Sequence, residues 1–224
     1  MLFTISQQIG IILLFATVLV FVWTTATVVA CALTRIKMDK IAIFFGKPVF
    51  TIKTPLCPLH IGYIPTGAYV ARDLAEFATH PLYARWFMIA AGPIAVVLSA
   101  AACLGPHETI TQMSTALLQL SQGALHPITR GAPLVAKFFD TARQAPVLGY
   151  GLFAAKGATL YVLPLPVMPL GDMLIQVIPK GTNPRLIATL QTIGALFLLP
   201  FFLSWATAVI FGLWHPLLRL SMFH

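Results

Sequence analysis

Few side chains in this sequence could hold a metal ion or act as an acid or base, and they are widely spaced. The chain has 6 His, 3 Cys and 6 Asp or Glu, and it contains no H-x-x-x-H, C-x-x-C or H-E-x-x-H motif. Those spacings predict zinc sites because they bring ligands onto one helix face or around one turn. Cys57 and His60 are three apart, and Asp172 could join them in the fold. We favour the simpler interpretation of a hydrogen-bonded or interfacial His60 and of buried or membrane-facing thiols.

Lys156 is the one charged residue inside a long apolar stretch, and charges in such places are functional candidates. One hypothesis is that its ammonium group supplies a local positive charge and pairs with Asp172. We favour the alternative that Lys156 reaches a lipid headgroup or pairs with an acidic residue of a partner subunit.

The composition indicates that membrane-spanning helices position these residues. Hydrophobic residues make up 58% of the chain and charged residues 9%, against about 45–50% and about 25% in soluble domains. A span needs about 20 mostly apolar residues. Three stretches without any charge, and a fourth that contains only Lys156, are this long. The predicted spans lie near 8–33, 84–104, 146–163 and 187–213.

The net charge of +8 comes from basic residues that are distributed unequally between the two sides of the membrane, and it does not indicate a nucleic-acid-binding surface. Most Lys and Arg residues fall in the first and third connections between spans. These connections are therefore predicted to face the cytoplasm, with both termini outside it. We expect an integral protein of a bacterial inner membrane, or of an organellar equivalent, that contacts anionic lipid.

The connections between the spans have distinct patterns. Residues 40–72 contain short β-branched and aromatic runs broken by Gly and Pro, which predicts a small re-entrant antiparallel sheet packed against the helices. Residues 105–145 form an interfacial segment, with a short helix expected at 114–125. We expect residues 1–224 to form a single membrane domain.

Five stretches resemble the site-2 protease family of intramembrane zinc metalloproteases. They occur in the family's order, and they are Phe45-Gly46-Lys47, Ile64-Pro65-Thr66-Gly67-Ala68-Tyr69-Val70, the Arg85–Ala95 segment with its Ala91-Gly92-Pro93, Leu163-Pro164-Leu165-Pro166-Val167-Met168, and the last apolar stretch around Thr192–Leu199. The resemblance implies a site-2-protease-like core. The connection at 105–145 is too short to hold the PDZ domain that some members carry.

The resemblance also implies where the zinc ligands would fall. The two His positions of the family's H-E-x-x-H are Trp23 and Thr27, the Glu position is Thr24, and the third ligand position is Pro169. None of these side chains is a usual zinc ligand or general base. We therefore expect no metal and no catalytic residues, and we expect a pseudoprotease and not an enzyme.

The predicted function is that of a structural, binding or assembly subunit of a larger membrane complex. An inactive scaffold could still bind a partner's transmembrane segment by strand addition. The expected binding residues are Ile64, Pro65, Gly67, Tyr69, Pro164, Pro166 and Lys156. We expect other transmembrane subunits and lipids as partners, no nucleic acid and no cofactor, although the aromatic content is compatible with lipid or pigment contacts. Two alternatives are a membrane metalloprotease with a relocated site at His60, Asp172 and a thiol, and a small transporter or channel.

Overall fold

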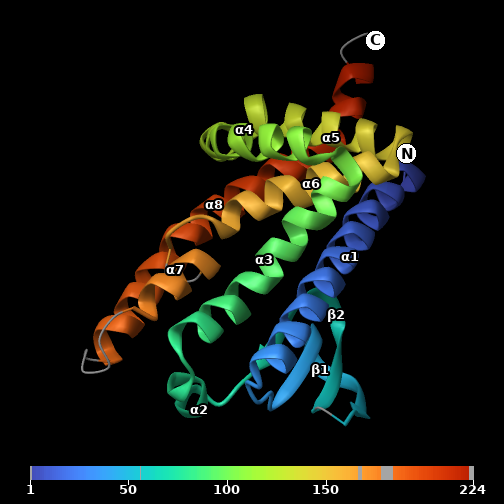
Figure 1. Ribbon diagram of the computed structural model, residues 1–224. Helices are drawn as coiled ribbons and strands as arrows, with labels where there is room; N and C mark the ends of the chain where they lie inside the picture. Colours follow the sequence, from blue (N-terminus) through green and yellow to red (C-terminus); the bar gives the residue numbers. More distant parts are fainter. Residues whose placement is uncertain (1, 56, 166–167, 178–183, 222–224) are drawn as a thin grey trace.

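The computed structural model describes residues 2–55, 57–165, 168–177 and 184–221 (Figure 1). The elements are α1 (Leu2–Thr34), β1 (Lys40–Lys53), β2 (Pro58–Ala71), α2 (Leu74–Thr79), α3 (Leu82–Leu104), α4 (Pro106–Leu125), the π-helical turn η1 (Pro127–Gly131), α5 (Ala132–Gln144), α6 (Pro146–Tyr161), α7 (Pro169–Ile175) and α8 (Pro184–Ser221). The protein is mostly helical, and its small sheet lies between α1 and α3 in the chain, as predicted.

Three helices in the described part of the chain are long and apolar enough to cross a membrane. They are Ile5–Thr34 in α1, Leu82–Leu104 in α3 and Ala188–Leu213 in α8. These helices match three of the four predicted spans. The fourth stretch, 146–163, folds as α6, whose 16 residues extend for about 24 Å and so fall short of a hydrocarbon layer of about 30 Å. The small residues of α6, among them Ala154 and Ala158, are buried inside the protein.

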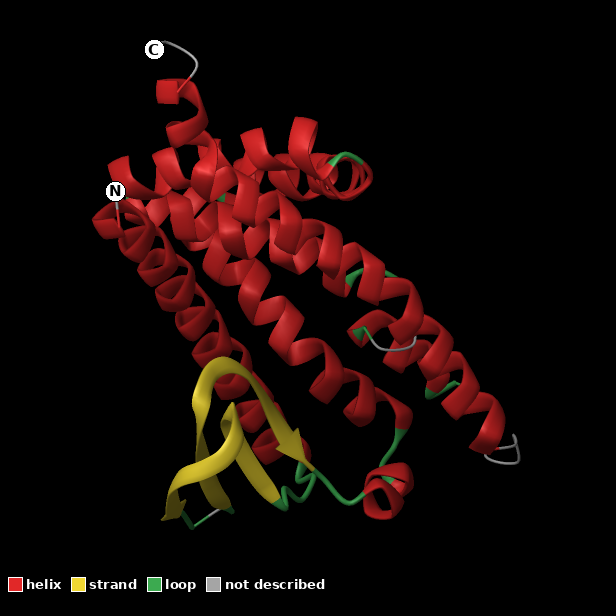
Figure 2. Ribbon diagram, turned by 180° about the vertical axis from the view of Figure 1, so that it is seen from behind, coloured by secondary structure: helices red, strands yellow, loops and turns green. Residues whose placement is uncertain are grey.

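The helices form a bundle in which α3 packs against both α1 and α6. Small residues allow close approach between helices, as expected in a membrane. For example, a Cβ on Gly149 of α6 would lie 2.6 Å from the Cα of Ala142 in α5. The helices α4 and α5 cross the end of the bundle near the N-terminus, whereas the sheet and α2 lie at the opposite end (Figures 1 and 2). The helix expected at 114–125 is the second half of α4, which begins earlier, at Pro106, a residue favoured at helix starts.

The sheet is made of two long antiparallel strands that each bend near the middle. Ile41 pairs with both Val70 and Leu59, so the first half of β1 lies between the two halves of β2. Gly46 and Gly67 take positive φ angles of 96° and 69° at the bends, which glycine adopts without steric cost. The bends fold the sheet back beside α1.

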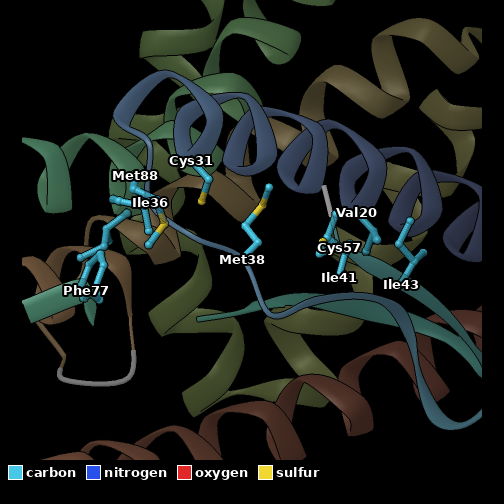
Figure 3. Close-up of a cluster of buried hydrophobic side chains, with 10 residues drawn as sticks. Val20, Cys31, Ile36, Met38, Ile41, Ile43, Cys57, Phe77 and Met88 are labelled. Carbon is cyan, nitrogen blue, oxygen red and sulfur yellow. The ribbon is translucent and has the colours of Figure 1, made fainter. Parts of the chain in front are cut away.

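A cluster of buried apolar side chains joins the sheet to α1 (Figure 3). It consists of Val20, Cys31, Ile36, Met38, Ile41, Ile43, Cys57, Phe77, Met88 and Ile89. Cys31 and Cys57 are thus buried free thiols, as our sequence interpretation expected, and Cys103 is half-buried. This apolar contact fixes the sheet against the membrane-spanning part of the protein.

Candidate functional site

A cavity of about 800 Å³ lies among α1, α4, α5, α6 and α8, with β2 at one edge. Its walls are largely apolar and include Ile12, Leu19, Trp23, Phe138, Phe153 and Leu160. Small-molecule sites typically occupy about 300–1,000 Å³ and combine apolar walls with a few polar groups. The cavity therefore has the size and character of a site for a hydrophobic ligand or segment.

Trp23 fills the space between α3 and α6 beside this cavity. Its ring packs edge-on against Tyr161, with the ring centroids 4.7 Å apart. Gly92 of α3 lies directly against the indole, because a Cβ at Gly92 would lie 2.5 Å from Cδ2 of Trp23. Gly67 and Ala68 of β2 also line the cavity. The indole, the tyrosine ring and the strand thus share one apolar surface.

The polar groups of the cavity come from α4, α5 and α6. Lys156 donates a hydrogen bond from Nζ to Oε1 of Gln119, at 2.5 Å. Lys137 of α5 and Gln112 of α4 also line the cavity. The structure therefore gives Lys156 an amide partner within the chain, and the hypothesis that Lys156 pairs with Asp172 is wrong.

Asp172 instead anchors the short helix α7 to the rest of the protein. Its Oδ2 lies 3.5 Å from Nη2 of Arg72, which directly follows β2. Arg85 of α3 donates a hydrogen bond from Nη1 to Oε1 of Gln176, at 2.8 Å. Burial lowers the pKa of Arg72, and the nearby carboxylate of Asp172 opposes that shift. These contacts hold α7 against α3 and the sheet.

The hypothesis of a relocated metal site joined His60 to Asp172 and a thiol, and the structure does not bring these groups together. His60 Nδ1 lies 3.1 Å from Oγ1 of Thr51 on the neighbouring strand. Asp172 is paired with Arg72, and Cys57 is buried under the sheet. Within the residues that the structure describes, no three His, Cys, Asp or Glu side chains are close enough to hold a metal ion.

The positions that the sequence resemblance aligned with the zinc-binding residues of site-2 proteases carry no usual metal ligand. Trp23 packs against Tyr161, and Thr27 donates its hydroxyl to the carbonyl oxygen of Trp23, at 3.0 Å. The Thr24 hydroxyl is buried without a hydrogen-bond partner among the described residues. Pro169 begins α7 and has no donor atom to offer in its side chain. This set of side chains does not fit a zinc ion.

The predicted segment-binding residues divide into three groups. Gly67 and Lys156 line the cavity. Ile64, Tyr69 and Pro164 are exposed and lie outside its lining. The side chain of Pro65 and the whole of Pro166 fall outside the described residues.

Several lining residues were missed because they come from the connection predicted only as an interfacial segment. The contributions of α4 and α5, such as Gln119, Lys137 and Phe138, are of this kind. One feature of the sequence could have found them. Val135, Phe138, Phe139 and Ala142 recur at helical spacing, and this pattern predicts a helix with one buried face.

Comparison with models of protein families gives a match over most of the chain. Residues 11–201 match the sequence model of peptidase family M50, which is the site-2 protease family. The match confirms the resemblance drawn from the five stretches. It contradicts our prediction that the chain is not an enzyme, because the family is one of peptidases and so indicates a protease. A search of the curated proteins found no significant match.

Proposed function

The chain belongs to peptidase family M50, and from this we propose that it binds a transmembrane segment of another membrane protein in the cavity among α1, α5, α6 and α8. The observation that carries the proposal is the position of the cavity. Its apolar walls come partly from α1 and α8, two helices able to span a membrane, and strand β2 forms one edge. A segment that leaves the lipid would find apolar side chains and an open strand in the same place.

The outer edge of β2 is suited to an extended backbone. The half of β2 that contains Ala68 pairs with β1 on one side, and no other described strand pairs with its second side. Unpaired backbone groups are costly at membrane depth. An extended segment could satisfy them by strand addition, with its side chains in the cavity. Gly67 and Ala68 offer little steric hindrance to such a strand.

Family membership indicates proteolysis, but the side chains around Trp23 do not fit a zinc ion. We therefore assign to the cavity the binding of the segment and derive no hydrolytic step through a metal. The proposed partners are other transmembrane proteins, which the chain holds as the binding component of a membrane complex. The sheet end of the bundle, with Arg35, Lys37 and Lys40, is proposed to face the cytoplasm.

The proposal can be tested by photo-crosslinking in the native membrane. A photoreactive residue is placed at Ala68 or Leu160, which line the cavity, and, as a control, at Leu98 of α3, which is 63% exposed and lies outside it. We expect the two cavity positions to crosslink to the same membrane protein, within one of its transmembrane segments, and Leu98 not to do so. Crosslinks to lipid alone, or the same products from Leu98, would refute segment binding.

The fate of the crosslinked partner distinguishes a substrate from a stable binding partner. Its length is compared between cells with and without the chain. A shortened partner that appears only with the chain identifies the segment as a substrate. An intact partner that co-purifies with the chain in stoichiometric amount identifies a stable complex.

A further inference from the structure

Two lysine side chains line the cavity, and neither forms an ion pair with a described carboxylate, although the exposed Asp140 lies one turn from Lys137 on α5. Lys137 comes from α5 and Lys156 from α6. These two helices pack against each other. Among the described residues, the ion pair that forms joins Arg72, next to β2, to Asp172 of α7, and it does not involve these lysines. Lys137 is exposed, whereas Lys156 is partly buried. A partly buried ammonium group without a counter-charge is unfavourable, so Lys156 favours an anion, and the positive charge of Lys137 adds to the attraction.

The hydrogen-bond donors at this end of the cavity exceed the acceptors. An ammonium group has three donors, and one donor of Lys156 is used by Gln119 Oε1. That bond leaves the amide NH2 of Gln119 free to donate. The nearest acidic side chain on α4, Glu108, already accepts from Gln112, at 2.7 Å. Three donor groups from three helices therefore remain for a ligand rich in acceptor oxygens, as a phosphate is.

The rest of the cavity suits a hydrocarbon chain. Ile12, Ala16 and Leu19 line it from one face of α1, and the distance along the helix from Ile12 to Trp23 is about 17 Å. The aromatic rings of Phe138 and Phe153 lie across from this face, 6.2 Å apart between centroids. The lysines and glutamines come from the helices that cross the end of the bundle, or from α6 beside them (Figure 1). The cavity is thus polar and positive toward one end and apolar along its length.

We propose that this cavity binds an anionic phospholipid of the surrounding bilayer, with its phosphate at Lys137, Lys156 and Gln119 and one acyl chain along α1. Charge complementarity and the neighbouring bilayer favour a lipid over the acidic side chain of a partner helix. The lipid and the proposed segment would share the cavity, but the phosphate site rests on residues other than Gly67 and Ala68, so substitution of the lysines tests lipid binding without altering the strand edge.

Gly157 offers a way to block the acyl chain without disturbing the lysines. It lines the cavity, and a Cβ there would meet only Cδ1 of Leu19, at 3.9 Å, which is ordinary contact. A Gly157→Leu variant therefore fills the apolar part of the cavity. Arg143 provides the matched charge control, because it is an exposed basic residue of α5 outside the cavity lining.

The test is native mass spectrometry of the full chain released from nanodiscs that contain equal amounts of phosphatidylglycerol and phosphatidylcholine. The wild type should retain phosphatidylglycerol, with a preference of about tenfold or more over phosphatidylcholine. The double variant Lys137→Gln, Lys156→Gln should lose that preference, Gly157→Leu should retain little of either lipid, and Arg143→Gln should behave as the wild type. Equal retention of the two lipids by the wild type would overturn the proposal, as would a loss of preference in Arg143→Gln.

Two further outcomes also decide the matter. Size-exclusion chromatography shows whether the lysine variant folds. If it does not fold, folded Gly157→Leu decides: unchanged lipid retention overturns the proposal, and loss of retention supports it. If a peptide segment with an acidic residue remains bound in place of lipid, and the lysine variant releases it, the anion belongs to a protein and the lipid site is refuted.

Discussion

Substitution of Gly92 by Ala tests whether the indole of Trp23 packs directly against helix α3. The added Cβ would lie 2.5 Å from Cδ2 and Cε2 of the indole, a distance at which atoms must move. Tyr161 also packs against the indole, so the open space for the ring is the cavity that Trp23 lines. The two helices must therefore separate or the ring must leave its place.

The size of the effect is set by two opposing contributions. Overpacking of a filled interior costs about 1–3 kcal/mol, and contact with a rigid ring places Gly92→Ala near the upper value. Replacing glycine by alanine inside a helix returns about 1 kcal/mol. We expect a net loss of about 2 kcal/mol in the free energy of unfolding. In a Trp23→Leu background the clash is absent, so the same change should stabilise the protein by about 1 kcal/mol, which gives a coupling of about 3 kcal/mol.

The assay is reversible unfolding in mild detergent, measured for the wild type, the two single variants and the double variant. Gly10→Ala serves as the control, because a Cβ at Gly10 of α1 would meet nothing within 4 Å. That control should leave stability unchanged or raise it by up to about 1 kcal/mol. If Gly92→Ala behaves like Gly10→Ala, or if its cost is the same with and without the indole, the packing of Trp23 against Gly92 is refuted.

Three other results are expected. Asp172→Asn should cost no more than about 1 kcal/mol, because its ion pair with Arg72 is partly exposed, and unfolding in detergent measures it; a loss several times larger would mean that α7 is held by more than the described contacts. Burial raises the pKa of Cys57, so in a variant with this single cysteine the thiol should react with maleimide more slowly than in the denatured chain. The contribution of the neutral thiol to the free energy of unfolding is complete below the thiol pKa of the unfolded chain. It should decline as the pH rises through the pKa of the folded protein, and Cys57→Ser should lack this decline. Cysteines placed at Lys53 and Arg130 should be labelled by an impermeant reagent from opposite sides of the membrane, Lys53 from the cytoplasmic side, and labelling from one side would reject the proposed orientation.

The long apolar helices and the sheet could be predicted from local sequence. Hydrocarbon thickness sets the length of apolar sequence that a membrane span needs. The stretches that form α1, α3 and the middle of α8 could therefore be recognised from length and lack of charge alone. The sheet was predictable from β-branched and aromatic runs broken by glycine and proline at 40–72. The family relation was also visible, because short motifs in a fixed order survive changes elsewhere. The residues that the resemblance aligned with the zinc ligands did not establish that the chain lacks activity, and the match to a peptidase family corrected that inference.

By itself, then, the sequence determined that this is a membrane protein of the site-2 protease family, because composition and the order of motifs can be read along the chain without knowledge of its tertiary contacts. The tertiary structure alone decided that α6 is a short buried helix, that Lys156 bonds to Gln119, that Asp172 pairs with Arg72, and that Trp23 packs against Gly92. Each of these contacts joins residues from different elements. Their partners depend on how the helices cross and how closely small residues let them approach, which no local pattern in the sequence specifies.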